Sequence, residues 1–144
     1  MIEVRPFRPF HIALLRAQGV QGAQERAVSH VPENIDSLGL TAGPAVTAFD
    51  GELVLLTGGV LPFGQRRGVC WALLSAHAGR HMTRLHYATE RFLSAGNWRR
   101  LEATVEEGFK PGCRWLQLLG FEFEGRMRGY GDDGETHLRY GRVF

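Results

Sequence analysis

The pattern of hydrophobic and polar positions is clearest between residues 44 and 75. Segments 44–49 and 52–62 flank Asp50-Gly51, a dipeptide that strongly indicates a tight β-hairpin. Segment 67–75 is almost unbroken in its apolar character, which indicates a strand covered on both faces. We therefore predict three consecutive strands that form a meander.

Patterns on either side of this meander predict further strands and helices. The expected strands are Ile2 to Pro6, 100–107, 121–131 and 135–143. The expected helices are a short one after Pro9 that ends at Gly19, one over about Arg80 to Ala95, and one from Pro111 to Gly120. Residues 20–43 have only weak periodicity and are interpreted as a poor helix plus a loop. The order predicts one α/β domain over residues 1–144. It is an α/β sandwich around a mixed, mostly antiparallel sheet of about six to seven strands, with about four helices.

Composition narrows the class of protein without naming a function. Hydrophobic residues make up 44% of the chain and charged residues 22%, which is typical of a soluble globular domain. No apolar run is long enough to cross a bilayer, and the N-terminus lacks the pattern of a secretory signal. We expect a cytoplasmic protein whose Cys70 and Cys113 are free thiols. A net charge of +2 makes nucleic acid an unlikely partner.

The segment SAHAGRHMTRLHYATERF, residues 75–92, carries the candidate chemistry. Its histidines His77 and His81 have the spacing of two metal ligands on one helix turn. Gly79 interrupts that turn, His86 lies on the far flank of the helix, and no cysteine or acidic residue stands nearby at ligand spacing. We therefore expect no metal site in this segment.

The end of the chain resembles the GNAT superfamily of N-acyltransferases. Residues 115–119, WLQLL, run into Gly120-Phe121 as the corresponding helix of that family runs into its Leu-Gly-Phe. Glu124-Gly125-x-x-Arg128, followed by a Gly-Asp-Asp-Gly turn, is especially similar to the GNAT-like proteins of tailed phages and prophages. The order of elements matches over most of the chain, and the specific motif covers about residues 100–138.

This resemblance implies a binding site for acetyl-CoA. In the family the fourth strand and the next one splay apart, and the thioester arm lies between them. The pyrophosphate sits on backbone N–H groups at the start of the following helix, where the helix dipole favours negative charge. Carried onto this sequence, the cofactor-binding residues are Leu73, Leu74, Ser75, Gly79, Arg80 and Arg84. We expect segments 71–75 and 101–106 to be neighbours that diverge at one end.

Two parts of the family pattern are altered here. The phosphate turn, usually Gln/Arg-x-x-Gly-x-Gly/Ala, reads Ala76-His-Ala-Gly79-Arg-His81, so that a bulky imidazole takes the last small position. Arg80 and Arg84 are positioned to pair with phosphates from the side. The tyrosine that often protonates the leaving thiolate is replaced by Leu116, and the usual asparagine at the start of that helix falls at Phe109.

The candidate general base is Glu106, at the end of the strand that borders the expected splay. A carboxylate there is placed to take a proton from an attacking amine, directly or through water. Alternation puts Glu102, Thr104 and Glu106 on one face and Glu107 on the other. Trp71 is interpreted as core or as cleft wall, and Ser75 as a group that binds a ligand amide rather than as a nucleophile.

Two functions stay open at this point. One is an N-acyltransferase that moves an acetyl group from acetyl-CoA to a small amine or a protein amine. The other is a non-catalytic phage or prophage protein, associated with the virion if phage-encoded, that keeps the fold as a structural or binding module. A second copy of the chain or a phage protein are the macromolecular partners that we consider, and a membrane is not.

We predict that no zinc copurifies with the protein, because His77, His81 and His86 are poorly aligned for a shared metal. Elemental analysis of the purified protein checks this. Stoichiometric zinc that disappears when His77 and His81 are both substituted would contradict the prediction.

Overall fold

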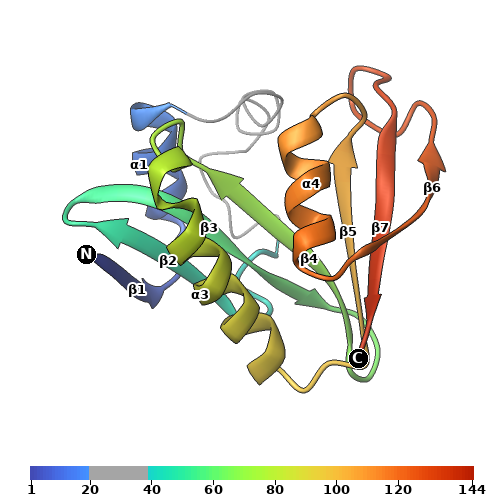
Figure 1. Cartoon of the computed structure of the whole chain (residues 1–144), viewed down its shortest axis with the longest axis horizontal. Coiled ribbons are helices and arrows are strands. Elements are labelled where there is room, and N and C mark those ends of the chain that lie inside the picture. Colours follow the sequence, from blue (N-terminus) through green and yellow to red (C-terminus); the bar gives the residue numbers. More distant parts are fainter. Residues whose placement is uncertain (20–38) are drawn as a thin grey trace.

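The computed structural model describes residues 1–19 and 39–144, and in that part of the chain the strands form one seven-stranded sheet (Figure 1). The elements are β1 (Ile2–Pro6), α1 (Phe10–Gln18), β2 (Ala45–Asp50), β3 (Leu53–Pro62), β4 (Arg67–Leu74), a 3₁₀ turn (Gly79–His81), α3 (Met82–Ala95), β5 (Arg100–Glu106), α4 (Lys110–Leu118), β6 (Glu122–Met127) and β7 (His137–Val143). The predicted mixed sheet is confirmed, with three α-helices among the described residues. The poor helix expected between 20 and 43 falls mostly on residues 20–38, outside the described part.

The strand order is β1-β2-β3-β4-β5-β7-β6, and all the pairs are antiparallel except β4 with β5. The predicted meander β2-β3-β4 is therefore confirmed. The last strand, β7, enters between β5 and β6. The helix after β4 begins with a 3₁₀ turn at Gly79 and ends before Asn97, whose φ of 53° stops it as expected.

Helices cover both faces of the sheet. On one face, α1 packs against a buried cluster that includes Phe49, Val54 and Leu73. On the opposite face, α3 packs against Leu55 and Leu74, and Figure 1 shows α3 and α4 in front of the sheet. Because Leu73 and Leu74 belong to different clusters, β4 is covered on both faces, as its apolar run predicts.

The two halves of the sheet meet only at one end of β4 and β5. Their parallel pairing joins Arg67 with Arg100, Gly68 with Leu101 and Val69 with Glu102, and it goes no further. Beyond this point β4 remains paired with β3 as far as Leu74, and β5 remains paired with β7 as far as Glu106. The predicted divergence of segments 71–75 and 101–106 is confirmed.

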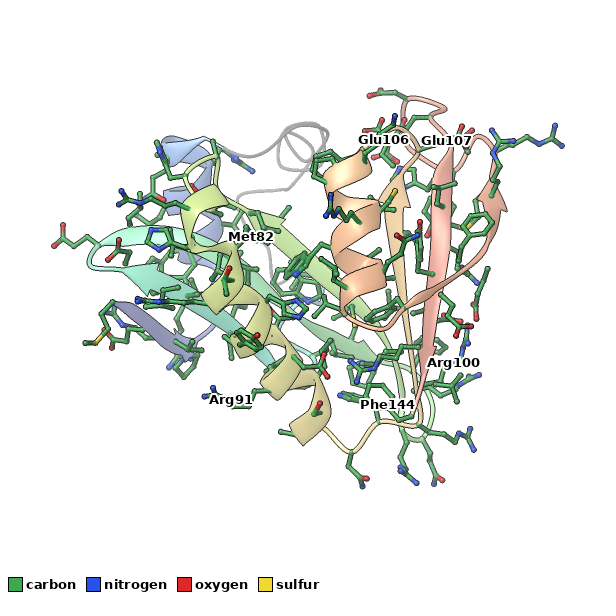
Figure 2. All side chains as sticks on the ribbon, in the orientation of Figure 1. Met82, Arg91, Arg100, Glu106, Glu107 and Phe144 are labelled. Carbon is green, nitrogen blue, oxygen red and sulfur yellow. The ribbon has the colours of Figure 1, made fainter. Side chains whose placement is uncertain are left out.

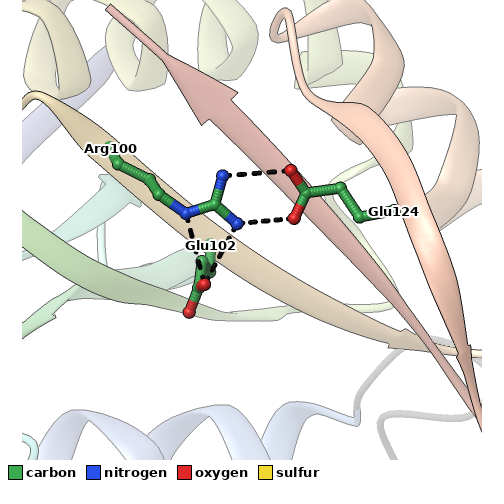
Figure 3. A network of polar contacts seen from close by, with 3 residues as sticks. All are labelled: Arg100, Glu102 and Glu124. Carbon is green, nitrogen blue, oxygen red and sulfur yellow. Dashed lines mark hydrogen bonds and ion pairs between the residues drawn. The ribbon is translucent and has the colours of Figure 1, made fainter.

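Two arginines of the second half of the sheet bind carboxylates across its elements. Arg100 on β5 donates hydrogen bonds to Glu102 and to both carboxylate oxygens of Glu124 on β6 (Figure 3). The side chain of Glu124 lies over Gly141 of β7. A Cβ on Gly141 would be only 2.5 Å from the Glu124 carboxylate, so any larger residue at position 141 would displace that carboxylate. The Arg100 guanidinium lowers the pKa of Glu124.

Arg142 on β7 joins three elements on the opposite face. Its guanidinium donates to both oxygens of Glu90 on α3, each at 2.9 Å, and to the carbonyl oxygen of Leu119 at 2.9 Å. The hydrogen bonds from Arg142 lower the pKa of Glu90. This contact fixes the C-terminal half of α3 relative to the end of α4 and therefore sets the distance between the two helices.

A buried polar chain attaches α1 to the first half of the sheet. His11 is 4% exposed, and its Nδ1 accepts the N–H of Arg8 at 3.0 Å. The Thr47 hydroxyl lies 2.7 Å from the same nitrogen, and the Thr57 hydroxyl lies 3.0 Å from that of Thr47. Because Nδ1 accepts, the neutral ring carries its proton on Nε2. Burial, with further contributions from Arg5 and Arg8, lowers the pKa of His11.

Among the described residues, none of the helices combines the length and the apolar character that crossing a bilayer requires.

We predict that this histidine makes folding sensitive to acid. The unfolded chain binds a proton at His11 near pH 6.5, whereas the folded chain binds it only at lower pH, so the free energy of unfolding falls as pH drops below about 6.5. The contribution of one such group is at most about 1.4 kcal/mol per pH unit. Urea unfolding at pH 7.5 and 5.5 measures it. His11→Asn keeps an acceptor for the Arg8 N–H and should lose less stability between these two pH values. An equal loss in both proteins would contradict the assignment.

Candidate functional site

The divergence of β4 and β5 opens a groove of about 1450 Å³ in the described part of the chain. Its lining residues come from β4, β5, α3, α4 and the loop between β6 and β7, and on the side of β4 also from β1, β2 and β3. Pockets for single small ligands usually measure 300–1,000 Å³. This groove is therefore large enough for an extended ligand together with a second, smaller molecule.

The loop after β4 is fixed by Ser75. Its side chain is fully buried, its N–H donates to the carbonyl oxygen of Leu55 at 2.9 Å, and its hydroxyl accepts the N–H of His77 at 3.0 Å. The carbonyl of Ser75 accepts the N–H of Ala78 at 3.1 Å. Ser75 is not among the residues that line the groove. In this structure it shapes the loop, whereas the sequence suggested a contact with ligand.

The turn at Gly79 presents its backbone to open space. Apart from its own chain neighbours, no atom of the described residues lies within 4 Å of the position that a Cβ on Gly79 would occupy. Within the described part of the chain, no hydrogen bond engages the N–H groups of Gly79 and Arg80. A hollow of about 450 Å³ adjoins the turn, lined by Ala76, His77, Gly79 and Arg80 together with Leu53. Two free N–H groups ahead of the 14-residue helix α3 form an arrangement suited to an anion.

The ring of His81 is directed toward the β2–β3 turn. Its Nε2 lies 3.4 Å from the Asp50 carboxylate and 3.3 Å from Nε of Arg80. The N-terminal amine of Met1 lies 3.5 Å from the other oxygen of Asp50. The altered family pattern suggested that this imidazole would obstruct the turn, yet the space next to Gly79 is open.

The other wall of the groove ends at Glu106. Figure 2 shows Glu106 and Glu107 together at the end of β5 that lies opposite Arg100. Glu106 lines the groove, whereas Glu107 binds Arg126 through two hydrogen bonds of 2.6 and 2.8 Å. These bonds lower the pKa of Glu107 and direct its carboxylate to β6. Only one of the two adjacent glutamates therefore faces the groove, as alternation along the strand predicts.

Side chains from β7 and the β6–β7 loop surround Glu106. His137 stands directly across from it in the β5–β7 pairing, and its Nε2 lies 3.4 Å from the carboxylate of Glu135. The Tyr130 ring is 5.2 Å from the His137 ring, and Asp132 also lines the groove. Sequence reasoning missed this polar end, because the position of β7 beside β5 is a long-range feature without a local signal.

The remaining predicted residues are distributed over the site as follows. Leu73 and Leu74 line the groove from β4, and Arg80 lines the hollow at the turn. Arg84 is exposed on α3 and is not among the residues that line the groove; the same is true of Arg91, which Figure 2 shows at the outer side of the helix. Leu116 lies in the hydrophobic cluster under α4, so this position supplies no hydroxyl to the groove.

The described residues hold no group of three or more histidine, cysteine, aspartate or glutamate side chains arranged to bind a metal ion. Both cysteines are free, and burial raises the pKa of Cys70 to about 12, which leaves it a protonated thiol and a poor nucleophile.

No model of a known protein family matches the sequence, and no curated protein is similar to it in sequence. The structure, in contrast, is similar to many solved structures. An N-acetyltransferase from Staphylococcus aureus has a TM-score of 0.74 at 10% identity, covering 99% of this chain and 97% of that one. An acetyltransferase of the GNAT family from Streptococcus pneumoniae has a TM-score of 0.69 at 15% identity and covers 100% of both chains. The ribosomal-protein-S5-alanine acetyltransferase from Vibrio fischeri has a TM-score of 0.66 at 13% identity, covering 99% and 92%. At these identities the similarity establishes the fold, which is that of the GNAT acetyltransferases.

Proposed function

We propose that this protein is an N-acetyltransferase that transfers an acetyl group from acetyl-CoA to an amine. The observation that carries the proposal is the divergence of β4 and β5 after three residue pairs, which opens a groove from the Gly79 turn to Glu106. In this fold the groove is the place for the thioester arm, and the turn is the place for the pyrophosphate.

The turn has the groups that a pyrophosphate requires. Among the described residues nothing else binds the N–H groups of Gly79 and Arg80, so they can donate to phosphate oxygens, and Arg80 lines the hollow next to the turn. Ala76 and His81 depart from the family pattern in their side chains. Backbone donors do not depend on side-chain identity, so the turn keeps its binding groups in spite of both changes.

Glu106 is the group that we assign as general base. The amine nitrogen forms a bond with the thioester carbonyl carbon, and a proton from the nitrogen passes to the Glu106 carboxylate, directly or through a water molecule. The bond between carbon and sulfur then breaks. The thiolate receives its proton from solvent, because Leu116 has none to give. The products are an N-acetylated amine and CoA.

The acceptor is an amine that fits the polar end of the groove beside Glu106 and His137. A small amine and a protein amine are both compatible with this end, which opens at the β6–β7 loop. One structural neighbour named above acts, by its name, on an alanine of a ribosomal protein. For this chain we propose only that the acceptor is an amine, and we do not carry over the protein substrate of that neighbour.

A non-catalytic module that retains the fold is the second candidate. The observations that favour it are three replaced positions: Ala76 and Leu116 lack the family side chains of the turn and of the leaving-group site, and His81 adds a bulky ring where the family has a small residue. Such a protein would not bind acetyl-CoA. The likeness to phage and prophage proteins, a virion or cytoplasmic location, and a homodimer stay predictions of the sequence.

We predict that the wild-type protein binds acetyl-CoA and that Gly79→Glu weakens this binding at least about tenfold, or about 1.4 kcal/mol. The new carboxylate would repel the phosphates, and the open space at Gly79 allows it without a clash. Gly125→Glu is the matched control, because Gly125 also has open space around it and lies on β6. Titration calorimetry measures all three proteins. Equal binding by the two variants would show that the phosphate turn is misplaced, and no binding by the wild type would favour the non-catalytic module.

We predict that Glu106→Gln lowers the turnover number about 100-fold while leaving the affinity for acetyl-CoA within about twofold. Glutamine has nearly the same size but does not accept the proton of the amine. The release of free CoA thiol, with the best acceptor from a panel of polyamines, amino acids and short peptides, measures the rate. Glu107→Gln removes the neighbouring carboxylate, which is bound to Arg126, and should retain most of the activity. Equal losses in both variants would exclude Glu106 as the specific base.

A further inference from the structure

Several residues that line the groove carry a buried ring nitrogen that has no hydrogen-bond partner within the described part of the chain. They are Nε1 of Trp71, Nδ1 of His86, Nε1 of Trp115 and Nδ1 of His137, the last of which lies at the Glu106 end of the groove. Buried polar atoms in folded proteins are almost always paired, and an unpaired one requires an explanation. Four unpaired nitrogens on the residues that line one groove are candidates for polar groups that a bound molecule satisfies.

Two of these nitrogens belong to the helices that flank the groove on one face of the sheet. His86 is on α3 and Trp115 is on α4. Trp115 packs against the buried clusters of both halves of the sheet, which include Leu74 of β4 and Leu101 of β5. Its indole therefore lies over the split between the two strands. Trp71, in contrast, belongs to the cluster under α1 on the opposite face.

The positions of these two rings define the shape of the ligand. His86 follows Gly79 by seven residues along a continuous helical path, which corresponds to about 10 Å. A molecule held by its phosphates at the turn must therefore present polar atoms about 10 Å further along the groove. Among them must be an acceptor, because an indole N–H only donates, whereas imidazole Nδ1 either donates or accepts.

We propose that Trp115 Nε1 and His86 Nδ1 bind the amide groups of the cofactor arm, which lie between the pyrophosphate and the thioester. This inference rests on the proposed function, since it assigns further binding residues to the same ligand. Trp115 donates its N–H to an amide carbonyl oxygen, and His86 forms a second hydrogen bond with the arm. Both contacts are made by side chains, in addition to any backbone contacts with β4. These two contacts recognise polar atoms in the middle of the ligand. They add to the binding at the Gly79 turn, where the family side chains are replaced.

The test uses Trp115→Phe, which removes the N–H and keeps most of the aromatic surface, and His86→Leu, which removes the imidazole nitrogens. Titration calorimetry with CoA and with adenosine 3′,5′-bisphosphate separates the arm from the nucleotide, because the second ligand has no arm. We expect each variant to weaken the binding of CoA about fivefold, the effect of one hydrogen bond, and to leave the binding of the bisphosphate unchanged.

Trp98→Phe is the matched control, because Trp98 is a partly buried tryptophan that does not line the groove. It should bind both ligands as the wild type does. If Trp115→Phe and His86→Leu bind CoA like the wild type, this inference is wrong and the proposed function stands. A variant that weakens both ligands equally would also overturn it, since a general distortion would then be the cause. Absence of CoA binding by the wild type would remove the proposed function and this inference together.

Discussion

The short pairing between β4 and β5 is the constraint on which the site depends. Each strand is paired along its other edge, β4 with β3 and β5 with β7, so each half of the sheet is complete in itself. The halves are held together at the closed end, where the carbonyl oxygen of Arg66 accepts the N–H groups of Arg99 and Arg100. The Arg66 guanidinium also binds Asn97. A corner fixed in this way lets the opposite ends of β4 and β5 separate without leaving either half unpaired.

The helices keep this split open while covering it. On one face, Arg142 binds Glu90 of α3 and the Leu119 carbonyl at the end of α4, so a partly buried ion pair sets the separation of the two helices. Trp115 fills part of the space between them. Interactions at the closed end and on the helix face thus determine the width of the groove, whereas the chemistry that we propose is assigned to other residues, Gly79 and Glu106.

Much of this arrangement is predictable from the sequence, because it depends on local patterns of hydrophobic and polar residues. Alternation around Asp50-Gly51 and the apolar run 67–75 give the meander, and alternation at 102–106 assigns Glu106 to the groove. The contacts that change the interpretation of the site are long-range. Nothing near His81 indicates that its ring contacts Asp50, and nothing near His137 indicates that it stands across from Glu106. Such contacts follow from strand register and loop position, which tertiary packing decides.

The loss of a proton donor at Leu116 weighs less than the loss of a base would. A thiol of the cysteine type has a pKa of about 8.5, so a thiolate is a tolerable leaving group near neutral pH. A primary amine of the lysine type has a pKa of about 10.4 and is mostly protonated there, so it must lose a proton before it attacks and another afterwards. Under the proposed function, a chain that has leucine in place of the acid but retains a groove-lining carboxylate at Glu106 keeps the proton transfer that the reaction needs more. The replacements Ala76 and His81 likewise leave the backbone N–H groups of the Gly79 turn in place, because neither residue is a proline.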